Sequence, residues 1–317
     1  MKKFLKVLLI TAVLVLGSVA SLQVLSTNLG FSFYIFPPSL ESVGSQALAR
    51  MDKFGIYSSS AQWQDSKLAY KKLVKEAQDQ EDLVRILDDA SKLAGGKHSS
   101  CSLLKSQDQR TDLYIEPTIK KDQDLLYIKL PEFVASSDQE QAYAEKLAEA
   151  LADQTIKKVI VDLRDNPGGS MYPMILGLAP ILPEGRVFSL VDKNNRETMA
   201  IDLDQGRIKA YKGLEVSKKE KLADGKIAVL CGPGTGSSAE ATLLALKGLD
   251  QVKVFGQPTA GYLSVNQGYV LGDDIFLNLT VGFFKDRQGK IYGQEALEPD
   301  FPSQNPYEDA LVWLNEN

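Results

Sequence analysis

The chain has 317 residues, of which 44% are hydrophobic and 24% charged, so it can bury a substantial core as one large or two modest domains. Its formal net charge is −5 and it has no basic run beyond the extreme N-terminus, which argues against nucleic-acid binding. The mild acidity favours a cationic partner, but only weakly.

The first segment differs from the rest of the chain. Three lysines in the first six residues precede a charge-free apolar run over residues 7–25. A run of this length can span a bilayer or act as the core of a secretion signal, and the lysines place the N-terminus in the cytoplasm. We predict a membrane anchor over residues 1–30, with the remaining chain extracellular at the cell membrane. A cleaved signal is the alternative, because Ser18-Val19-Ala20 offers small residues for cleavage.

The next region reads as helical. Residues 40–94 carry apolar side chains at helical spacing, as at Leu83, Leu87 and Ala90. A glycine pair follows directly and is typical of a helix end. We therefore predict a small helical bundle over residues 31–110, and this bundle carries the single histidine of the chain, His98.

Strands and helices alternate from residue 124 onward. Residues 125–130 predict a strand, and Ser137 with Glu140 predicts a capping box that opens the next helix. Residues 157–163 are an uninterrupted apolar strand, which is typical of a buried, largely parallel sheet. Further elements are predicted as a helix at 170–182, strand, helix and strand at 226–231, 237–248 and 252–256, and a hairpin around 286–289.

The predicted fold class is therefore α/β, with a peptide chain of three parts: the anchor, the helical bundle, and an α/β core over residues 111–317. A small cap is appended to the core around residues 185–220, and its strands read as antiparallel. In such a core the loops at the carboxyl ends of the strands form the expected site.

The chain has only two cysteines, Cys101 and Cys231. In an exported protein two cysteines can pair, but two alone do not make a disulfide framework. Cys231 ends an apolar strand and reads as a small buried hydrophobic residue. Neither lies in the N-terminal apolar segment, where a lipid-modified cysteine would stand.

Three glycine-rich junctions follow predicted strands, at residues 165–170, 232–238 and 256–263. The second ends in two serines at a helix start, where backbone N–H groups and the helix dipole favour negative charge. The first offers the N–H groups of Gly168 and Gly169 to a developing oxyanion. Any one of these junctions can be an ordinary turn, but the three together predict a nucleophile beside oxyanion donors, as acyl transfer requires.

These junctions carry a family resemblance. VIVDLRDNPGGS, GPGTGSSAEAT, GQPTAG and LTVGFFKDRQGKIYGQEALEPD occur in that order, and residues 124–303 resemble the core of the C-terminal processing (tail-specific) serine peptidases. The resemblance implies an α/β serine peptidase core. Members typically pair the serine with a lysine that follows the glycine of G-x-P-T-x-G. The matching register here makes Ser237 the nucleophile, three residues before Glu240, but Tyr262 stands where the lysine is expected.

A serine without a base is a poor nucleophile, so another group must take its proton. His98 lies in AGGKHSS, which resembles the G-x-H-[ST] element of the histidine-using branch of this superfamily, where tricorn-like and lantibiotic-resistance peptidases belong. The resemblance implies a Ser237–His98 dyad, although a lone histidine is more often structural. An ordinary imidazole pKa near 6.5 would place the acid limb of activity between about pH 6 and 7.

The short spacing after His98 indicates which branch of the superfamily the chain resembles. Fewer than 30 residues separate His98 from the strand at 125, so the PDZ module of ordinary tail-specific peptidases does not fit. The resemblance to the lantibiotic-resistance branch implies a membrane-anchored extracellular enzyme that clips a cationic lantibiotic, such as nisin, near its C-terminus. A general tail-specific envelope peptidase and a non-catalytic lantibiotic-binding immunity protein are the alternatives.

Other residues have candidate roles in this site. Ser238 is the rival nucleophile, or it supplies an oxyanion N–H or a helix cap. Glu240 either complements the helix dipole or orients His98 or the substrate. The candidates for substrate contact are Asn166, Ser170, Met171, Tyr172 and Tyr262, and Asn166 fits a loop-fixing role as well. No cofactor and no metal ion are expected.

Overall fold

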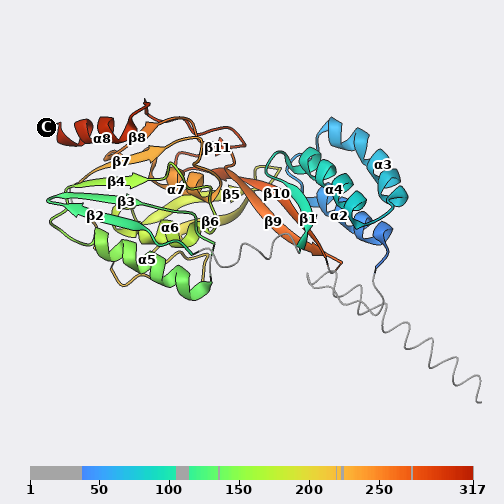
Figure 1. Cartoon of the computed structure of the whole chain (residues 1–317), viewed down its shortest axis with the longest axis horizontal. Helices are drawn as coiled ribbons and strands as arrows, with labels where there is room; N and C mark the ends of the chain where they lie inside the picture. Colours follow the sequence, from blue (N-terminus) through green and yellow to red (C-terminus); the bar gives the residue numbers. More distant parts are fainter. Residues whose placement is uncertain are drawn as a thin grey trace, which may run out of the picture. The chain divides into compact units, whose positions relative to one another are not determined.

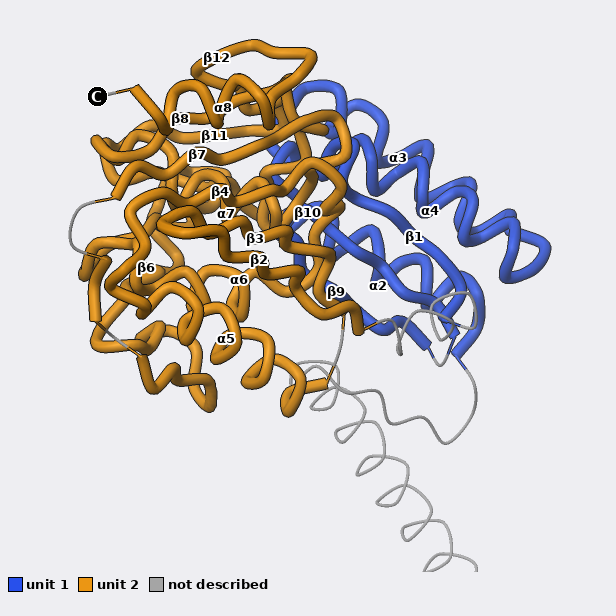
Figure 2. The backbone as a smooth tube through the Cα atoms, turned by 60° about the vertical axis from the view of Figure 1, so that its left-hand side comes forward, with its two compact units in different colours: residues 1–107, 266–280 blue, residues 108–265, 281–317 orange. Residues whose placement is uncertain are grey.

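The computed structural model describes residues 38–104, 114–134, 136–218, 220–222, 225–272 and 274–316. The chain divides into two compact units, one of residues 1–107 with 266–280 and one of residues 108–265 with 281–317 (Figure 2). Strands β9 (Ser264–Leu271) and β10 (Ile275–Lys285) each contribute residues to both units.

The predicted anchor over residues 1–30 lies outside the described residues. Among the helices in the described part of the chain, none combines the length and the apolar character that crossing a bilayer requires. The anchor stays a prediction from the sequence.

The described part of unit 1 begins with helices, as predicted (Figure 1): α2 (Leu40–Phe54), α3 (Ala61–Glu76) and α4 (Gln80–Gly95). Each starts at a Ser or Asp whose side chain accepts a backbone N–H of the first turn, which satisfies one of the otherwise unpaired donors there. Met51, Trp63 and Leu87, one from each helix, are fully buried in the core of this unit. The helical region was therefore predicted correctly.

Unit 1 also contains strands that the sequence did not reveal. β1 (Ser100–Leu103) pairs antiparallel with β10, with Ser100 opposite Asn278. β9 also pairs with β10. β1 is only four residues long and buries one of them, so it lacks the alternating pattern that marks a strand.

Unit 2 is built on a mainly parallel sheet, as predicted. Its strand order is β12-β8-β7-β4-β3-β2, in which β12, β8, β7, β4 and β3 run parallel and β2 pairs antiparallel with β3. The strands are β2 (Thr118–Asp122), β3 (Leu125–Lys129), β4 (Lys158–Asp162), β7 (Lys226–Cys231), β8 (Val252–Gly256) and β12 (Phe301–Pro302).

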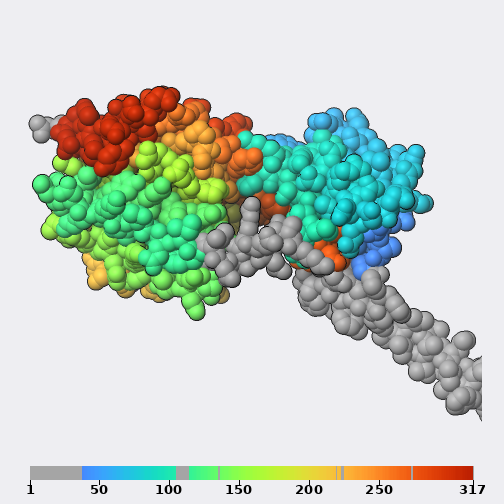
Figure 3. Space-filling model, in the orientation of Figure 1, coloured from blue at the N-terminus to red at the C-terminus, as the bar shows by residue number. Residues whose placement is uncertain are grey.

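Helices cover both faces of this sheet (Figure 1). Val159 and Val161 of β4 pack into one core with α5 (Ser137–Leu151), α6 (Met171–Gly177) and α7 (Ser238–Leu246). The intervening Ile160 faces the other core, against α8 (Pro306–Asn315), because successive side chains of a strand point to opposite faces. Figure 3 shows α8 as part of the outer surface of unit 2.

The appended strands lie where the sequence placed them. β5 (Gly185–Val191) and β6 (Glu197–Leu203) pair antiparallel. β5 also pairs with residues 283–285 of β10, and β10 forms the predicted hairpin with β11 (Ile291–Tyr292) around residues 286–289. The short 3-10 helix η3 (Ala179–Ile181) precedes β5.

One helix start was predicted one residue too late. α5 is capped by Ser136, whose backbone N–H donates to Gln139 Oε1 at 3.0 Å. The predicted box used Ser137 and Glu140 instead. Because Gln139 takes the capping position, the Glu140 carboxylate is free to bind groups from other elements, and it does so at the candidate site.

The two cysteines do not pair. Cys101 of β1 and Cys231 of β7 are both free thiols and both buried. Burial raises the pKa of each thiol to about 12, because the thiolate would lose its hydration.

Candidate active site

Two of the glycine-rich junctions lie against each other in unit 2: the glycine loop (residues 165–170) and the serine loop (residues 232–238). Both leave the carboxyl ends of neighbouring parallel strands, β7 and β4. The Gly236 N–H donates to the Asn166 carbonyl at 3.0 Å, and the buried Thr235 hydroxyl donates to the Leu163 carbonyl at 2.8 Å. The predicted convergence of these two junctions is therefore present.

Ser237 has a strained backbone at the start of α7. Its φ is +51° and its ψ is −117°, a conformation that residues with a side chain rarely adopt and that costs about 1–3 kcal/mol. Such strain persists only where the surroundings enforce it, and it is concentrated at functional sites. The sharp turn leaves Ser237 half-buried as the N-cap residue of the helix.

Ser238 is placed differently. Its hydroxyl donates a hydrogen bond to the Gly169 carbonyl. Within unit 2, no described atom accepts a hydrogen bond from the Ser237 hydroxyl. The sequence could rank the two adjacent serines only by register. In the structure they differ, because the Ser238 hydroxyl is hydrogen-bonded to the glycine loop, whereas the Ser237 hydroxyl has no acceptor among the described atoms of unit 2.

The two glycines of the loop also differ. The N–H of the buried Gly168 donates to Asn166 Oδ1 at 2.9 Å, so this amide is already used inside the protein. The exposed Gly169 N–H has no hydrogen-bond partner among the described residues. A methyl group added at Gly168 would lie 2.9 Å from Ser237 Cβ, which shows how closely this loop approaches the serine.

Gly169 cannot accept a side chain. Its φ is +103°, and a Cβ there would lie 2.0 Å from the Phe133 carbonyl oxygen, within backbone that pairs with this loop. We expect Gly169→Ala to lower the melting temperature by several degrees, because a backbone clash adds to the strain of positive φ. Cleavage activity should fall at least about tenfold as the loop shifts.

Gly185→Ala is the matched control, to be compared by thermal unfolding. Gly185 also has a positive φ, +91°, but a Cβ there would meet nothing within 4 Å. It should therefore show only the conformational cost of about 1–2 kcal/mol. Equal melting temperatures for the two variants would contradict the clash at Gly169.

Asn166 does not fit its predicted role in substrate contact. It is fully buried, its Nδ2 donates to the Pro131 carbonyl at 2.9 Å, and its Oδ1 accepts the Gly168 N–H. Its side chain is thus used to shape the loop. The loop-fixing interpretation, which the sequence also allowed, is the one that the contacts support.

Glu240 is a buried carboxylate that holds two loops together. It is 0% exposed and accepts four hydrogen bonds. Oε2 accepts the N–H groups of Ser237 at 2.9 Å and Tyr262 at 2.7 Å, while Oε1 accepts the Thr259 hydroxyl at 2.5 Å and the Gly261 N–H at 2.9 Å. These contacts go beyond complementing a helix dipole, and they fix the turn of Ser237 against the 259–262 loop.

The remaining candidates lie around these loops in unit 2. Ser170 donates from its hydroxyl to Glu140 Oε1 at 2.8 Å. Tyr172 stacks on Tyr211, with ring centroids 3.8 Å apart. Met171 is half-buried at the first residue of α6, and Tyr262, at the position of the missing lysine, is 36% exposed.

His98 belongs to unit 1, and Ser237 belongs to unit 2. His98 lies between the end of α4 and the start of β1, and its backbone carbonyl accepts a hydrogen bond from Asn278 Nδ2 at 3.1 Å. Burial, with a smaller contribution from the neighbouring Lys97 charge, lowers the pKa of His98 to about 4. The imidazole is therefore neutral from weakly acidic to alkaline pH, which is the form that accepts a proton.

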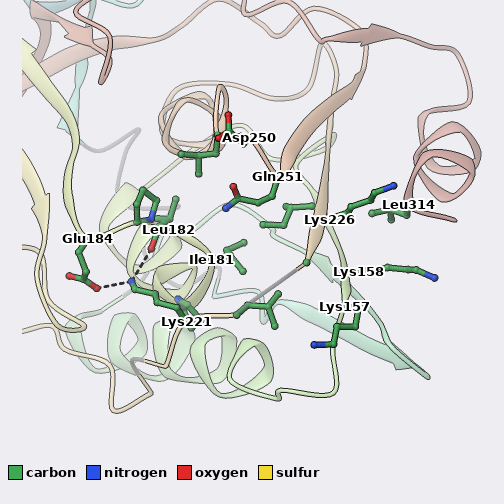
Figure 4. Close-up of a pocket in the computed structure, with 16 residues that line it drawn as sticks. Lys157, Lys158, Ile181, Leu182, Glu184, Lys221, Lys226, Asp250, Gln251 and Leu314 are labelled. Carbon is green, nitrogen blue, oxygen red and sulfur yellow. Dashed lines mark hydrogen bonds and ion pairs between the residues drawn. The ribbon is translucent and has the colours of Figure 1, made fainter. Parts of the chain in front are cut away.

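A separate cavity of about 780 Å³ lies at the other end of the sheet (Figure 4). It adjoins the first residues of β4 and β7, Lys158 and Lys226, whereas the candidate loops follow the last residues of these strands. Lys221 there pairs with Glu184 at 2.6 Å and donates to the Leu182 carbonyl. None of the predicted site residues lines this cavity.

Comparison with known proteins agrees with the sequence motifs. Residues 124–303 match peptidase family S41. The nisin-resistance protein of Lactococcus lactis subsp. lactis is 35% identical over 289 residues, covering 90% of this chain and 90% of that protein. A probable CtpA-like serine protease of Staphylococcus aureus is 24% identical over 156 residues, 49% of this chain and 29% of that protein.

Solved structures share the fold. A lipoprotein from Streptococcus agalactiae superposes with a TM-score of 0.79 at 33% identity, covering 90% of this chain and 99% of that one. The photosystem II D1 C-terminal processing protease superposes with a TM-score of 0.60 at 13% identity, over 88% of this chain and 98% of that one. The predicted resemblance is confirmed: the chain belongs to peptidase family S41 and is a serine peptidase homologous to the nisin-resistance protein.

Proposed function

We propose that this peptidase cleaves a cationic lantibiotic such as nisin near its C-terminus and so confers resistance to it. The observation that carries the proposal is the strained Ser237 at a helix start, beside the unused Gly169 N–H. The substrate class rests on the similarity to the nisin-resistance protein, which extends over 90% of both chains.

In the proposed mechanism Ser237 Oγ attacks the scissile carbonyl carbon. The neutral His98 imidazole takes the serine proton and returns it to the leaving amine, and water then hydrolyses the acyl-enzyme with the same imidazole as base. The N–H groups of Gly169 and Ser238 hold the negative charge that develops on the carbonyl oxygen. Gly168, proposed from the sequence as a donor, is replaced in this role because Asn166 engages its N–H.

Tyr262 occupies the position where related peptidases carry the lysine base, and this favours His98 as the general base of this enzyme. A phenol has an ordinary pKa near 10, so it is a poor base at neutral pH. The Tyr262 backbone N–H is bound by Glu240, which supports a role as part of the wall of the site.

We further propose that residues 1–30 anchor the enzyme in the cell membrane, with the helical bundle of residues 31–110 and the core of residues 111–317 outside. The similarity to a Streptococcus agalactiae lipoprotein supports an extracellular, membrane-associated location. The first cysteine of this chain is Cys101, so attachment through a cysteine in the N-terminal segment does not apply and the apolar segment itself would be the anchor.

Product analysis separates the proposed function from its alternatives. The full chain, purified in detergent, is incubated with nisin and with an unfolded envelope protein, and the products are weighed by mass spectrometry. One C-terminally shortened nisin product is expected. Degradation of the unfolded protein with intact nisin would favour a general tail-specific peptidase, and intact nisin with full protection of cells would favour a binding immunity protein.

The pH dependence tests the base. Because the folded His98 has its pKa lowered to about 4, its neutral form dominates above that pH and is lost below it. We therefore expect kcat/KM to be flat from pH 5 to 8 and to fall as the pH drops toward 4, lower than an ordinary imidazole would give. His98→Ala should be nearly inactive throughout.

Intrinsic fluorescence at each pH distinguishes unfolding from titration in this experiment. An acid limb between about pH 6 and 7 in the folded enzyme would mean that the base is a solvated imidazole, contrary to the burial of His98.

A further inference from the structure

A carboxylate from α5, Glu140, reaches the candidate site and forms no ion pair with any residue that the structure describes. Glu140 is half-buried. Its Oε1 accepts the Ser170 hydroxyl at 2.8 Å and its Oε2 accepts the Tyr211 hydroxyl at 2.7 Å. A carboxylate can accept about four hydrogen bonds, so each oxygen retains capacity for another donor.

Two aromatic rings lie beside this carboxylate. Tyr172, from the start of α6, and Tyr211, from the segment after β6, stack with their ring planes 9° apart. The hydrogen bond to Glu140 is the main cause that raises the pKa of Tyr211 to about 12. Burial, with a smaller contribution from the Glu140 charge, raises the pKa of Tyr172. Both phenols are therefore neutral and leave Glu140 as the charge of the cluster.

This cluster is close to the proposed reaction centre. Ser170 is two residues from Gly168, so their Cα atoms are at most about 7 Å apart. Gly168 is in turn the residue whose added Cβ would lie 2.9 Å from Ser237 Cβ. Ser170 also follows Gly169, the proposed oxyanion donor. A side chain only a few residues from the scissile bond of a bound peptide can therefore reach Glu140.

We infer that Glu140, Tyr172 and Tyr211 form a subsite that binds a lysine or arginine side chain of the peptide substrate. A carboxylate favours an ammonium or guanidinium group through charge-assisted hydrogen bonds, and aromatic faces add cation–π attraction. The inference deepens the proposed function and rests on it for the direction of the peptide. It gives a local origin for a preference for cationic peptides, which the weak net charge of −5 does not supply.

The cluster also has a positioning role that a test must separate from binding. α5 holds the segment after β6 at other points: Gln141 Nε2 donates to the Glu215 carbonyl at 2.5 Å, and Glu145 accepts the Ser217 N–H at 2.9 Å. Removal of Glu140 could therefore loosen the loop as well as remove a charge. Only the charge effect depends on the substrate being cationic.

The test compares Glu140→Gln with Glu145→Gln in the full chain. Both side chains come from α5 and hold the same segment, but among the described residues the hydrogen bonds of Glu145 go to Ser217, whereas those of Glu140 go to Ser170 and Tyr211. Binding of nisin and of nisin with acetylated amines is measured by calorimetry on a Ser237→Ala background, so that no cleavage is needed. Cleavage of both peptides is measured in parallel with Ser237 present.

We expect Glu140→Gln to weaken nisin binding about tenfold and acetylated nisin hardly at all, with the loss in cleavage appearing in KM rather than kcat. Glu145→Gln should treat both peptides alike. The subsite is refuted if Glu140→Gln weakens both peptides equally, if it changes neither, or if unmodified nisin binds no tighter than acetylated nisin. A charge-dependent effect on binding without cleavage of nisin by the wild type would uphold the subsite and refute the proposed cleavage of lantibiotics.

Discussion

Ser237→Ala is expected to abolish cleavage, with kcat falling by at least about three orders of magnitude, because the proposed acyl-enzyme forms on Ser237 Oγ. Binding of nisin should remain, since the substitution removes one oxygen from a half-buried position. In cells, protection should fall substantially and leave only what binding alone provides. Minimum inhibitory concentrations of nisin and product masses measure the two effects.

Ser238→Ala is the matched control for this prediction. Ser238 is adjacent and of the same type, but its hydroxyl is bound to the Gly169 carbonyl. Its loss should loosen the glycine loop and lower kcat about tenfold, while the Ser238 N–H remains in place. If Ser238→Ala were the inactive variant and Ser237→Ala the active one, the nucleophile would be Ser238 and the family register would be misaligned.

The central strands of unit 2, β4 and β7, were predictable because they are buried on both faces. Residues 157–163 and 226–231 read as uninterrupted apolar runs, and the helices between such strands carry ordinary helical spacing. β9 escaped prediction because Asn266, Gln267 and Gly268 interrupt its apolar pattern, and four of its eight residues are exposed or half-buried in a row. Pairing with β10, rather than a hydrophobic face, explains why it forms a strand.

Several features of the site depend on tertiary contacts that no local pattern encodes. Ser136 with Gln139 and Ser137 with Glu140 are equally good capping boxes on paper, and Glu140 is withdrawn from that role by Ser170 and Tyr211. Tyr211 lies 71 residues from Glu140 in the chain. The sequence could place Glu140 on a helix, but not at the site.

The distinction between the two loop glycines has the same origin. Gly168 and Gly169 are equivalent as letters, and both have positive φ. What separates them is the direction of the Asn166 side chain, whose Oδ1 turns to Gly168 because its Nδ2 binds the Pro131 carbonyl. The glycine pair predicted an oxyanion site from the sequence. The contacts of the buried Asn166 side chain indicate that the Gly169 N–H, rather than the Gly168 N–H, is available to it.

Glu240→Ala is expected to produce the largest loss of stability among these variants. The substitution leaves the donors of Thr259 and Gly261, which are buried, and those of Ser237 and Tyr262, which are partly buried, without their acceptor. Each unpaired buried donor costs about 1–3 kcal/mol, though not additively. We expect a loss above about 4 kcal/mol, which corresponds to a fall in melting temperature of roughly 10 °C or more for a unit of this size. Differential scanning calorimetry measures this change.

Glu240→Gln should also lose most of its activity, although the substitution keeps the size of the side chain. The reason is geometric. Each carboxylate oxygen accepts two donors, Oε1 from Thr259 and Gly261 and Oε2 from Ser237 and Tyr262. An amide has only one oxygen, so its NH₂ group must face either the N–H groups of Ser237 and Tyr262 or the Gly261 N–H with the Thr259 hydroxyl. In either orientation at least one backbone N–H loses its acceptor. The contact between the Ser237 turn and the 259–262 loop is then weakened, and kcat should fall by at least about a hundredfold.

Glu308→Gln provides the comparison that separates this role from a dipole effect. Glu308 is also an acid in the first turn of a helix, α8, but it is exposed. Loss of its charge should cost no more than about 0.3–1 kcal/mol. If Glu240→Gln were equally mild in stability and activity, Glu240 would act only on the helix dipole, and the strained turn at Ser237 would have to be held by Gly236 and Thr235 alone, through their bonds to the loop after β4.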